Sequence, residues 1–591
     1  MTQALLRLRE KMRNEQIDIL LLPHNDRFQS EYLPAHEERF PWLNGFTGSW
    51  GFAIITAEKA ILFVDGRYTL QAPRQVDGNF WTIIQVLDQR PQQWLSENLQ
   101  PDQIVALEGW RFTVQGVQGW QKIITAKKAQ LQQREDDIFT GLWLDRPALP
   151  AGEAFALDLT FAGRSTDDKV TDLQDFMTKN HLDGYLVTDP GHVCWLLNMR
   201  GHDITHMPII LSMAFVAADG QISLFTDAGK IPDNLRALWG SRVTHHLFDE
   251  MVTTLIDHSA QKIGLDGSHC PSVLASLLKQ SGKELHEHAS PLELARAIKN
   301  VTEINGAHQA QLRDGIAVME TLYWLQSHES PTGLTEQDVI DYLDAQRAAQ
   351  ELFVETSFGA IVGSGPHGAF VHYDITPGDD IGLKNDTLLL IDGGGQYYDG
   401  TTDITRTISI GTPTPRMIAD YTAVLQGHIA LSVARFPHGT TGAALDTLAR
   451  APLWQVGRNY THGTGHGIGA FMGTHEGPQG FSYRSPVALQ AGMLITNEPG
   501  YYKTDGYGIR LENVVLVKDV TVDDDDQPML GFEALTVVPF ESHLINFGSL
   551  NATEKNWLRD YHQMVLDKTL PLLRPELQLW LQEKCKAFLV Q

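Results

Sequence analysis

The residues of this chain that could bind metals or transfer protons lie in four short segments between positions 357 and 517. Glycine is frequent in these segments, and it allows the backbone to turn sharply or to approach another strand closely. Carboxylates and imidazoles bind divalent cations and also act as general acids and bases. The candidate carboxylates are Asp392, Asp403, Glu498 and Glu512, and the candidate histidines are His372, His462, His466 and His475.

The four carboxylates lie in or beside apolar stretches typical of buried strands, such as LLLID, which ends at Asp392. Burying a carboxylate costs free energy unless a cation compensates its charge. Two divalent cations would balance four carboxylates, and one neutral imidazole would complete the ligand set. An oxygen-rich set with one histidine favours Mn²⁺, Co²⁺ or Zn²⁺ over an all-oxygen Ca²⁺ site or a cysteine-bound Zn²⁺. These residues therefore predict a site for two metals, although spacing alone does not choose between His462 and His466.

Two helices are expected to begin the part of the chain that carries these residues. Apolar residues at helical spacing predict a helix over roughly 303–326 with Thr302 as its N-cap, and a second helix over about 335–349. Strand-type segments follow. Asp392 is expected to end one buried strand, and Asp403 to open the next one after a glycine-rich turn.

The first half of the chain contains an internal repeat. Three short segments recur in the same order, and the similar pairs are 14–21 and 180–187, 62–65 and 224–227, and 107–109 and 265–267. Each copy starts with an amphipathic helix, and strands and helices then alternate. The sequence therefore predicts two similar α/β domains, at residues 1–157 and 158–301, followed by a domain at 302–591 that carries the candidate site.

The composition excludes several classes of protein. The chain has 591 residues, with 46 Lys and Arg against 72 Asp and Glu, which gives a formal net charge of −26. Such a charge argues against nonspecific binding to nucleic acid or to an anionic membrane. Three scattered cysteines argue against a disulfide framework, and no apolar run reaches the roughly 20 residues of a membrane span. We therefore expect a cytoplasmic protein that binds neither nucleic acid nor membranes.

Four motifs carry a resemblance to a known family. LIDGGGQYYDGTTDITRT, HGTGHGIG, NEPGYY and GIRLEN stand in this order between residues 389 and 513. The chain thereby resembles the pita-bread metallopeptidases, and among them the three-domain Xaa-Pro aminopeptidases (aminopeptidase P). The resemblance covers the whole length and implies a mixed fold, α/β and α+β. Two creatinase-like α/β domains would precede a pita-bread catalytic domain with a helical extension at its C-terminus.

The resemblance also assigns the candidate residues. It implies that two divalent metals, Mn²⁺ first and Co²⁺ or Zn²⁺ as alternatives, are held by Asp392, Asp403, His466, Glu498 and Glu512. Asp403 and Glu512 would bridge the two metals. His372, His462 and His475 match active-site histidines that are not ligands, and Glu498 would also accept a proton. Arg510 is expected to be a partner of the carboxylates, since on a strand it shares a face with Glu512.

The implied activity is hydrolysis of the bond between an N-terminal residue and a following proline, by a hydroxide that bridges the two metals. Peptides with proline in second position would be the substrates, and Phe370 and Tyr501 could line a pocket for the ring. One alternative is a prolidase that cleaves only dipeptides. Another is an inactive binding module of the same fold, which loss of a ligand residue would mark.

A homodimer is expected as well, mainly from the resemblance. The segment 553–590 adds apolar residues at helical spacing that could form a contact surface. They are Trp557, Leu558, Leu572, Leu573, Leu577, Trp580 and Leu581.

Several other polar residues have structural interpretations. His202 and His206 have the spacing of metal ligands on a helix, but Pro208 and β-branched neighbours disfavour a helix there. Asp65 and Arg67 flank a glycine and predict a turn. The acidic run 523–526 predicts a solvated loop.

Overall fold

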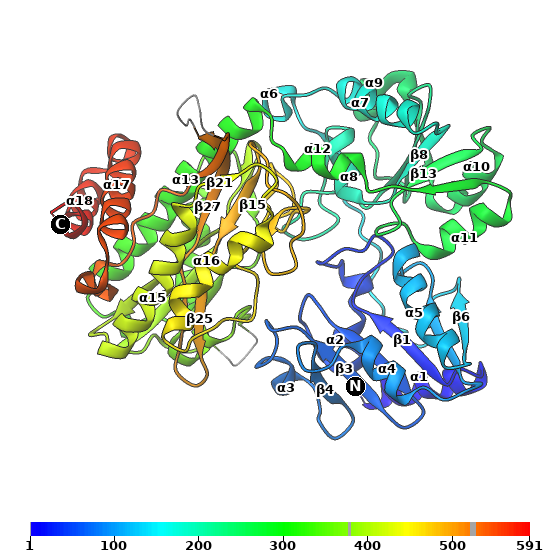
Figure 1. Cartoon of the computed structure of the whole chain (residues 1–591), viewed down its shortest axis with the longest axis horizontal. Coiled ribbons are helices and arrows are strands. Elements are labelled where there is room, and N and C mark those ends of the chain that lie inside the picture. The colour runs from blue at the N-terminus through cyan, green and yellow to red at the C-terminus, as the bar shows by residue number, and fades with distance from the viewer. Residues whose placement is uncertain (1, 376–379, 521–526, 591) are drawn as a thin grey trace. The chain divides into compact units, whose positions relative to one another are not determined.

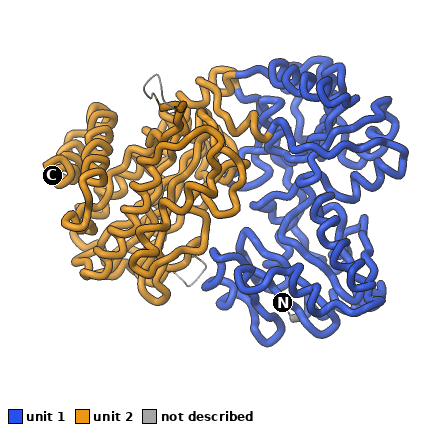
Figure 2. The backbone as a smooth tube through the Cα atoms, viewed as in Figure 1, with its two compact units in different colours: residues 1–157, 164–292 blue, residues 158–163, 293–591 orange. Residues whose placement is uncertain are grey.

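The computed structural model describes residues 2–375, 380–520 and 527–590, and it divides into two compact units (Figure 2). Unit 1 consists of residues 1–157 and 164–292, and unit 2 of residues 158–163 and 293–591. The short segment 158–163 thus belongs with unit 2, although in sequence it interrupts unit 1. The acidic run 523–526 lies outside the described residues.

Unit 1 begins with a six-stranded sheet in the order β4-β3-β2-β1-β5-β6. Its strands are β1 (Ile19–Pro23), β2 (Phe52–Thr56), β3 (Ala60–Val64), β4 (Thr82–Gln85), β5 (Ile104–Glu108) and β6 (Gln130–Arg134). The central strand β1 is apolar on both faces because helices cover both. Leu20 and Leu22 pack with α1 (Thr2–Asn14), and Ile19 and Leu21 with α4 (Pro91–Asn98) and α5 (Val114–Ala126).

A second six-stranded sheet follows in unit 1 with the order β12-β11-β10-β8-β13-β14. Its strands are β8 (Gly184–Val187), β10 (Met213–Ala217), β11 (Ile222–Thr226), β12 (Val243–Leu247), β13 (Lys262–Leu265) and β14 (Glu284–Glu287). β8 pairs antiparallel with β10 and parallel with β13, as β1 does with β2 and β5. The same topology in both sheets confirms the two similar α/β domains expected from the repeat.

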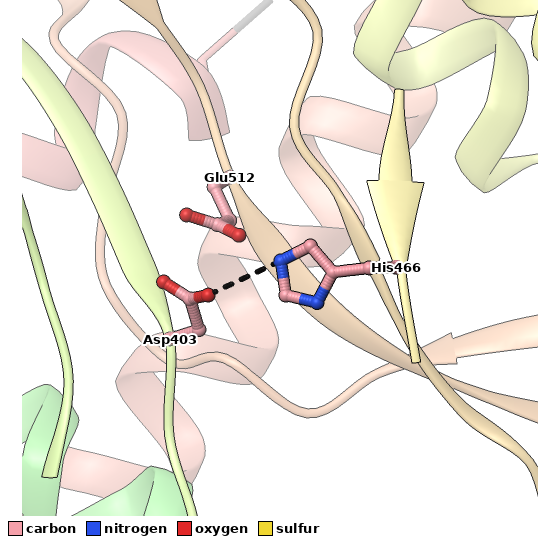
Figure 3. A group of neighbouring side chains, drawn as sticks. All are labelled: Asp403, His466 and Glu512. Carbon is pink, nitrogen blue, oxygen red and sulfur yellow. Dashed lines mark ion pairs between the residues drawn. The ribbon is translucent and has the colours of Figure 1, made fainter. Parts of the chain in front are cut away.

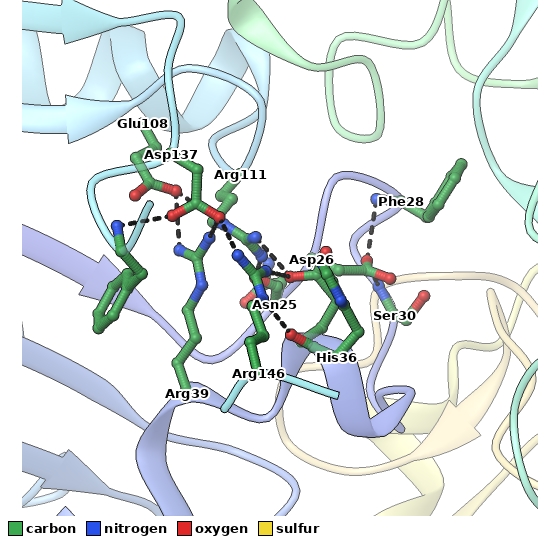
Figure 4. A network of polar contacts seen from close by, with 12 residues as sticks. Asn25, Asp26, Phe28, Ser30, His36, Arg39, Glu108, Arg111, Asp137 and Arg146 are labelled. Carbon is green, nitrogen blue, oxygen red and sulfur yellow. Dashed lines mark hydrogen bonds and ion pairs between the residues drawn. The ribbon is translucent and has the colours of Figure 1, made fainter. Parts of the chain in front are cut away.

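A buried network of polar side chains lies at the C-terminal end of β5 in unit 1 (Figure 4). Glu108 accepts hydrogen bonds from Arg39 at 2.7 Å, from Arg111 at 2.8 Å and from the Ile138 backbone N–H at 2.9 Å. Arg39 also pairs with Asp137 at 2.8 Å. Glu37, Glu108 and Asp137 each have a guanidinium partner, which offsets the cost of their desolvation, whereas the buried Asp26 accepts from the backbone N–H groups of Phe28 and Ser30.

Unit 2 combines short sheets with long helices (Figure 1). The helices are α13 (Val301–Ser327), α14 (Glu336–Ala348), α15 (Pro415–Ser432), α16 (Gly442–Gln455), α17 (Ala552–Thr569) and α18 (Pro575–Leu589). The strands that matter for the site are β17 (Thr387–Gly393), β20 (Ile404–Ile410), β22 (Gly465–His466), β24 (Leu494–Asn497), β25 (Gly500–Lys503), β26 (Tyr507–Arg510) and β27 (Asn513–Val520). One large apolar core joins α13, α14 and α15 with β17, β20 and the C-terminal helices α17 and α18.

The N-cap expected for α13 is wrong by two residues. Asn300, not Thr302, has the extended backbone of a cap, and its side chain accepts from the N–H groups of Thr302 and Glu303. The Glu303 carboxylate in turn accepts a hydrogen bond from the Asn300 N–H, which completes a capping box. Thr302 is instead the second residue of the helix.

Most apolar residues of the segment 553–590 pack within unit 2. Leu558, Leu573, Leu577 and Leu581 are buried in its main core, and Trp557 and Trp580 are half-buried against it. Leu572 remains 57% exposed. Among the described residues no helix is both long and apolar enough to cross a membrane.

We predict that unit 2 loses stability as the pH falls below about 6.5, in part through His562. Its Nδ1 contacts the Leu558 carbonyl at 2.6 Å, and its Nε2 accepts from the Phe540 N–H at 3.2 Å, which requires a neutral ring. Burial lowers the pKa of His562 to about 3. Between these two pH values the unfolded chain therefore binds a proton that the folded chain does not.

The measurement is urea unfolding of wild type and of His562→Gln at several pH values, followed by tryptophan fluorescence. The dependence of the unfolding free energy on pH should be weaker in the variant, by up to about 1.4 kcal/mol per pH unit. The exposed His438, whose side chain is 52% accessible, provides the control substitution His438→Gln. Equal pH dependence of all three proteins would contradict the assignment.

Candidate metal centre

Two antiparallel strands bring the candidate aspartates together. β17 pairs with β20 so that Asp392 lies opposite Thr405 and Gly393 opposite Ile404. Asp392 is thus near the end of β17, and Asp403 directly precedes β20 at the same end of the pair. The turn between them needs glycine, because a Cβ at Gly394 would lie 1.9 Å from the Thr402 carbonyl oxygen.

A second antiparallel pair places the two glutamates in the same way. β24 pairs with β27, and the register puts Asn497 opposite Asn513. Glu498 follows β24 and Glu512 precedes β27, so their carboxylates lie at the same edge. The Glu512 N–H donates to the Thr405 carbonyl at 3.1 Å, which joins this strand pair to the one that carries the aspartates.

The segment that carries His466 is bonded to the first of these glutamate strands. The His466 N–H donates to the Thr496 hydroxyl at 3.0 Å, and the Glu498 N–H donates to the Thr464 carbonyl at 2.8 Å. A Cβ at Gly465 would lie 1.8 Å from the Thr496 carbonyl oxygen. Glycine at this position is therefore what allows the histidine to approach the glutamates.

The side chains converge on one buried point. Ligand atoms of Asp403, His466 and Glu512 all lie within 4.8 Å of one another, and Figure 3 shows them directed at each other from separate strands. His466 Nε2 lies 3.5 Å from Asp403 Oδ2 and 3.6 Å from Glu498 Oε1. Asp392 joins the cluster through Arg510, whose guanidinium pairs with its carboxylate.

Burial and mutual repulsion raise the pKa values of three of these carboxyl groups. For Asp403, burial raises the pKa well above its usual value, and the charges of Asp392 and Glu498 add to it. For Glu512, burial and then Asp403 and Asp392 do the same. Burial raises the pKa of Glu498 to about 7, with Glu512 as a further cause. The cluster therefore carries more negative charge than the neighbouring Arg510 guanidinium balances.

Two oxygens in the cluster also lack hydrogen-bond partners. Among the residues that the structure describes, Asp392 Oδ1 and Glu512 Oε1 are buried without one, whereas Glu512 Oε2 accepts from the Thr405 hydroxyl at 2.7 Å. A buried acceptor without a donor is costly, and a cation would satisfy both oxygens at once. Carboxylate oxygens with one imidazole suit divalent transition metals, so the residues present fit the two metals expected from the sequence.

The other candidate histidines surround this cluster. The His475 ring centroid lies 4.3 Å from that of His466, and His372 follows at 6.3 Å from His475. His462 contacts the cluster indirectly: its Nε2 lies 2.9 Å from the Tyr502 hydroxyl, to which Arg510 donates at 2.8 Å. The structure thus places all three beside the ligand-type residues or one contact away.

The two aromatic residues expected to bind proline have other neighbours. Phe370 is buried beside Tyr373 and His367, at centroid distances of 5.9 and 6.4 Å. Tyr501 packs against the main core of unit 2, with the Arg458 guanidinium 5.4 Å from its ring. Both side chains thus have core neighbours, and a role for Phe370 or Tyr501 in binding the proline ring remains a prediction.

Sequence reasoning missed two residues that contact the site. Tyr502 links His462 to Arg510, and Thr405 donates to Glu512. The sequence held a signal for Tyr502, because it ends the motif NEPGYY that contains the candidate ligand Glu498. Thr405 gave no such signal, since its contact depends on pairing between distant strands.

Comparison with known proteins agrees with this geometry. Residues 305–519 match the description "Metallopeptidase family M24", and residues 528–588 match "C-terminal region of peptidase_M24". Residues 5–135 and 145–303 each match a "Creatinase/Prolidase N-terminal domain". The two matches in unit 1 correspond to its two six-stranded sheets.

Full-length relatives carry one activity in their names. A "Probable Xaa-Pro aminopeptidase P" of Laccaria bicolor is 37% identical, over 99% of this chain and 93% of the relative. "Xaa-Pro aminopeptidase 1" of Dictyostelium discoideum is 36% identical over 96% and 93%. The crystal structure of an X-prolyl aminopeptidase from Caenorhabditis elegans, described as a cytosolic enzyme with a di-nuclear active site, matches with a TM-score of 0.93 and 32% identity, over 99% of both chains. The fold class expected from the sequence is confirmed, and the chain belongs to the Xaa-Pro aminopeptidase P family of M24 metallopeptidases.

Proposed function

We propose that this protein is a metal-dependent aminopeptidase that hydrolyses the bond between an N-terminal residue and a following proline. The observation that carries the proposal is the buried carboxylate cluster of unit 2, with two oxygens that lack donors. The names of the full-length relatives support the same activity. Peptides with proline in second position would be the substrates.

The ligands in this proposal are Asp392, Asp403, His466, Glu498 and Glu512, which would hold two divalent metals, with Mn²⁺ as the expected metal. Asp403 and Glu512 would contact both metals, as the resemblance implies, and their ligand atoms lie within 4.8 Å of each other. When bound, the metals supply a Lewis acid and lower the pKa of a coordinated water.

The chain's own residues would then manage protons and position the substrate. Glu498 would accept the proton of the attacking water, since its carboxylate lies at the rim of the cluster, 3.6 Å from His466 Nε2. His475 and His372 would donate to the oxygen on which negative charge develops. A proline nitrogen carries no hydrogen in the peptide, so its departure needs a proton from a neighbouring acid, and a histidine would supply it.

Further parts of the proposal concern the whole molecule. We place the domain boundaries at 1–157, 158–301 and 302–591. Within the second of these, the Ala162 carbonyl of the segment 158–163 accepts a hydrogen bond from Asn300, the N-cap of α13. A cytoplasmic location is supported by the description of the C. elegans enzyme as cytosolic. A homodimer completes the proposal.

The first prediction tests the ligands. Glu498→Gln should abolish turnover while the fold persists, because it removes the proton acceptor and keeps the size of the side chain. Asp403→Asn should lower the metal content at both sites, since a bridging ligand is lost. Metal analysis and thermal unfolding of both variants check these outcomes.

Asp519→Asn on β27, the strand that follows Glu512, is the control, since this side chain is 73% exposed. It should keep the metal content and rate of wild type. Two ions per chain in Asp403→Asn, together with a normal rate, would remove Asp403 from the bridging position.

The second prediction tests the substrate. Arg-Pro-Pro peptides should be cleaved at least about 10²-fold faster than Arg-Ala-Pro, if roughly 3 kcal/mol of transition-state binding depends on the proline ring. The dipeptide Ala-Pro, incubated in parallel, separates an aminopeptidase from a prolidase. Equal rates on the first two peptides would show that proline does not direct cleavage, and cleavage of Ala-Pro alone would indicate a dipeptidase.

The third prediction tests the homodimer. The chain mass is 65.9 kDa, so light scattering at micromolar concentration should give about twice that value. Leu572→Glu, at an exposed position between α17 and α18, asks whether this region contributes, since an introduced charge would weaken an apolar contact there. A mass of one chain for the wild-type protein would refute the dimer.

A further inference from the structure

Arg406 lies at the back of the metal centre, three residues after Asp403 on β20. The side chain is fully buried, and its guanidinium lies over the Phe540 ring at 4.4 Å. It donates to six acceptors, all of them neutral. They are the carbonyl oxygens of Thr405 (2.8 Å), Glu512 (2.5 Å), Val538 (2.7 Å) and Pro539 (3.2 Å), Asn513 Oδ1 (2.8 Å) and the Tyr561 hydroxyl (2.9 Å).

These acceptors belong to two different parts of unit 2. Thr405, Glu512 and Asn513 lie on the strands that carry or precede the candidate ligands. Val538 and Pro539 belong to the segment that leads to the C-terminal helices, and Tyr561 lies on α17 itself. The planar guanidinium therefore connects the ligand strands to the C-terminal region over a separation of 155 residues.

The contact with Glu512 is direct. Arg406 Nη1 donates to the Glu512 carbonyl, and the same nitrogen donates to the Thr405 carbonyl. The Thr405 hydroxyl in turn donates to Glu512 Oε2, and the Glu512 N–H donates to the Thr405 carbonyl. A guanidinium has a fixed fork of donors, so it holds these two backbone positions in one register.

Tyr561 holds the other side of the guanidinium. Its ring stacks on Trp557 at 5.1 Å with an interplanar angle of 11°, and it packs against Phe540 at 5.2 Å. Its hydroxyl accepts from Arg406 and lies 2.8 Å from the Val538 carbonyl, to which it can donate. The hydroxyl is the atom through which α17 contacts the guanidinium, so its removal breaks that contact, while Nη2 keeps Asn513 Oδ1 and the Val538 carbonyl as acceptors for its two hydrogens.

We propose that Arg406 and Tyr561 are positioning residues through which the C-terminal helix α17 holds Glu512 in place and thereby sets the affinity for metal. The inference rests on the metal ligands of the proposed function. Tyr561 touches neither substrate nor metal in this scheme. Its hydroxyl acts through Arg406 on the backbone of Glu512.

The test compares Tyr561→Phe with a matched control, Tyr421→Phe. Tyr421 is also fully buried in the core of unit 2, and its hydroxyl accepts from the Glu541 N–H at 3.1 Å rather than from a guanidinium. The Mn²⁺ affinity of metal-free protein is measured by competition with a chelator, and the thermal midpoint of the metal-free protein is measured beside it. Tyr561→Phe should raise the Kd for Mn²⁺ roughly 10-fold, which corresponds to about 1.4 kcal/mol, and Tyr421→Phe less than about 2-fold.

Kinetics separate positioning from a general loss of stability. The Mn²⁺ concentration for half-maximal activity should rise in Tyr561→Phe, while KM for the peptide at saturating Mn²⁺ stays at the wild-type value. Arg406→Lys keeps the positive charge but loses the planar set of guanidinium donors, and it should raise the Kd for Mn²⁺ further. If Arg406→Lys does not fold, the pair of tyrosine variants still decides the question.

Equal Mn²⁺ affinities of Tyr561→Phe and Tyr421→Phe would overturn the inference, as would a loss of affinity that only follows the thermal midpoint of the metal-free protein. A wild-type protein that binds no Mn²⁺ would overturn the proposed metal and this inference together. Tight binding by wild type with unchanged affinity in Tyr561→Phe would overturn the inference alone.

Discussion

Repulsion among buried carboxylates is the constraint on which the catalytic unit depends. Asp403 and Glu512 lie against each other and against Asp392, in a space from which water is largely excluded. Without compensating charge this arrangement opposes folding, because each carboxylate raises the free energy of the next. The surrounding backbone must therefore hold the carboxylates in place, and cations from the solution must compensate their charge. The carboxylate oxygens that repel one another are the same atoms that would bind divalent metals.

The backbone meets this constraint by close packing of strands. At Gly394 and Gly465 another backbone carbonyl occupies the space that a side chain would need, so the ligand segments approach more closely than ordinary residues permit. Hydroxyl groups of Thr405 and Thr496 then bond across the strands without adding charge. Apart from the Arg510 guanidinium, which pairs with Asp392, the cluster is thus held by neutral donors and by close packing at glycine, and most of its negative charge stays available for cations.

The sequence singled out the candidate ligands because carboxylates in apolar strands are conspicuous, and family motifs then favoured His466 over His462. It also predicted both α/β domains, since the repeat preserves short segments in register. The N-cap of α13 was misplaced, because Thr302 and Asn300 both have capping side chains and only the backbone conformation distinguishes them. The roles of Arg406 and Thr405 were out of reach, since their partners lie more than 100 residues away in sequence.

Buried carboxylates have different roles in the two units. In unit 1, Glu108 and Asp266 follow or end equivalent strands, and each accepts a backbone N–H from the segment after the next parallel strand, Ile138 at 2.9 Å and Ser290 at 2.8 Å. The repeat has thus kept a structural carboxylate in both copies.

Compensation of charge distinguishes these carboxylates from those of the metal centre. Burial raises the pKa of Glu37 in the network of unit 1, but Arg111 and Arg39 lower it by more, so that it falls to about 2. In unit 2, burial outweighs the effect of the neighbouring Arg510 charge on Glu498, and its pKa rises to about 7. Burial is common to both sites, so burial alone does not mark function. Burial also raises the pKa of Asp26 in unit 1, so a single such carboxylate does not mark a site either. The distinguishing feature is the convergence of Asp403, Glu498 and Glu512, whose pKa values are all raised, and the chemistry of the molecule is therefore expected in unit 2.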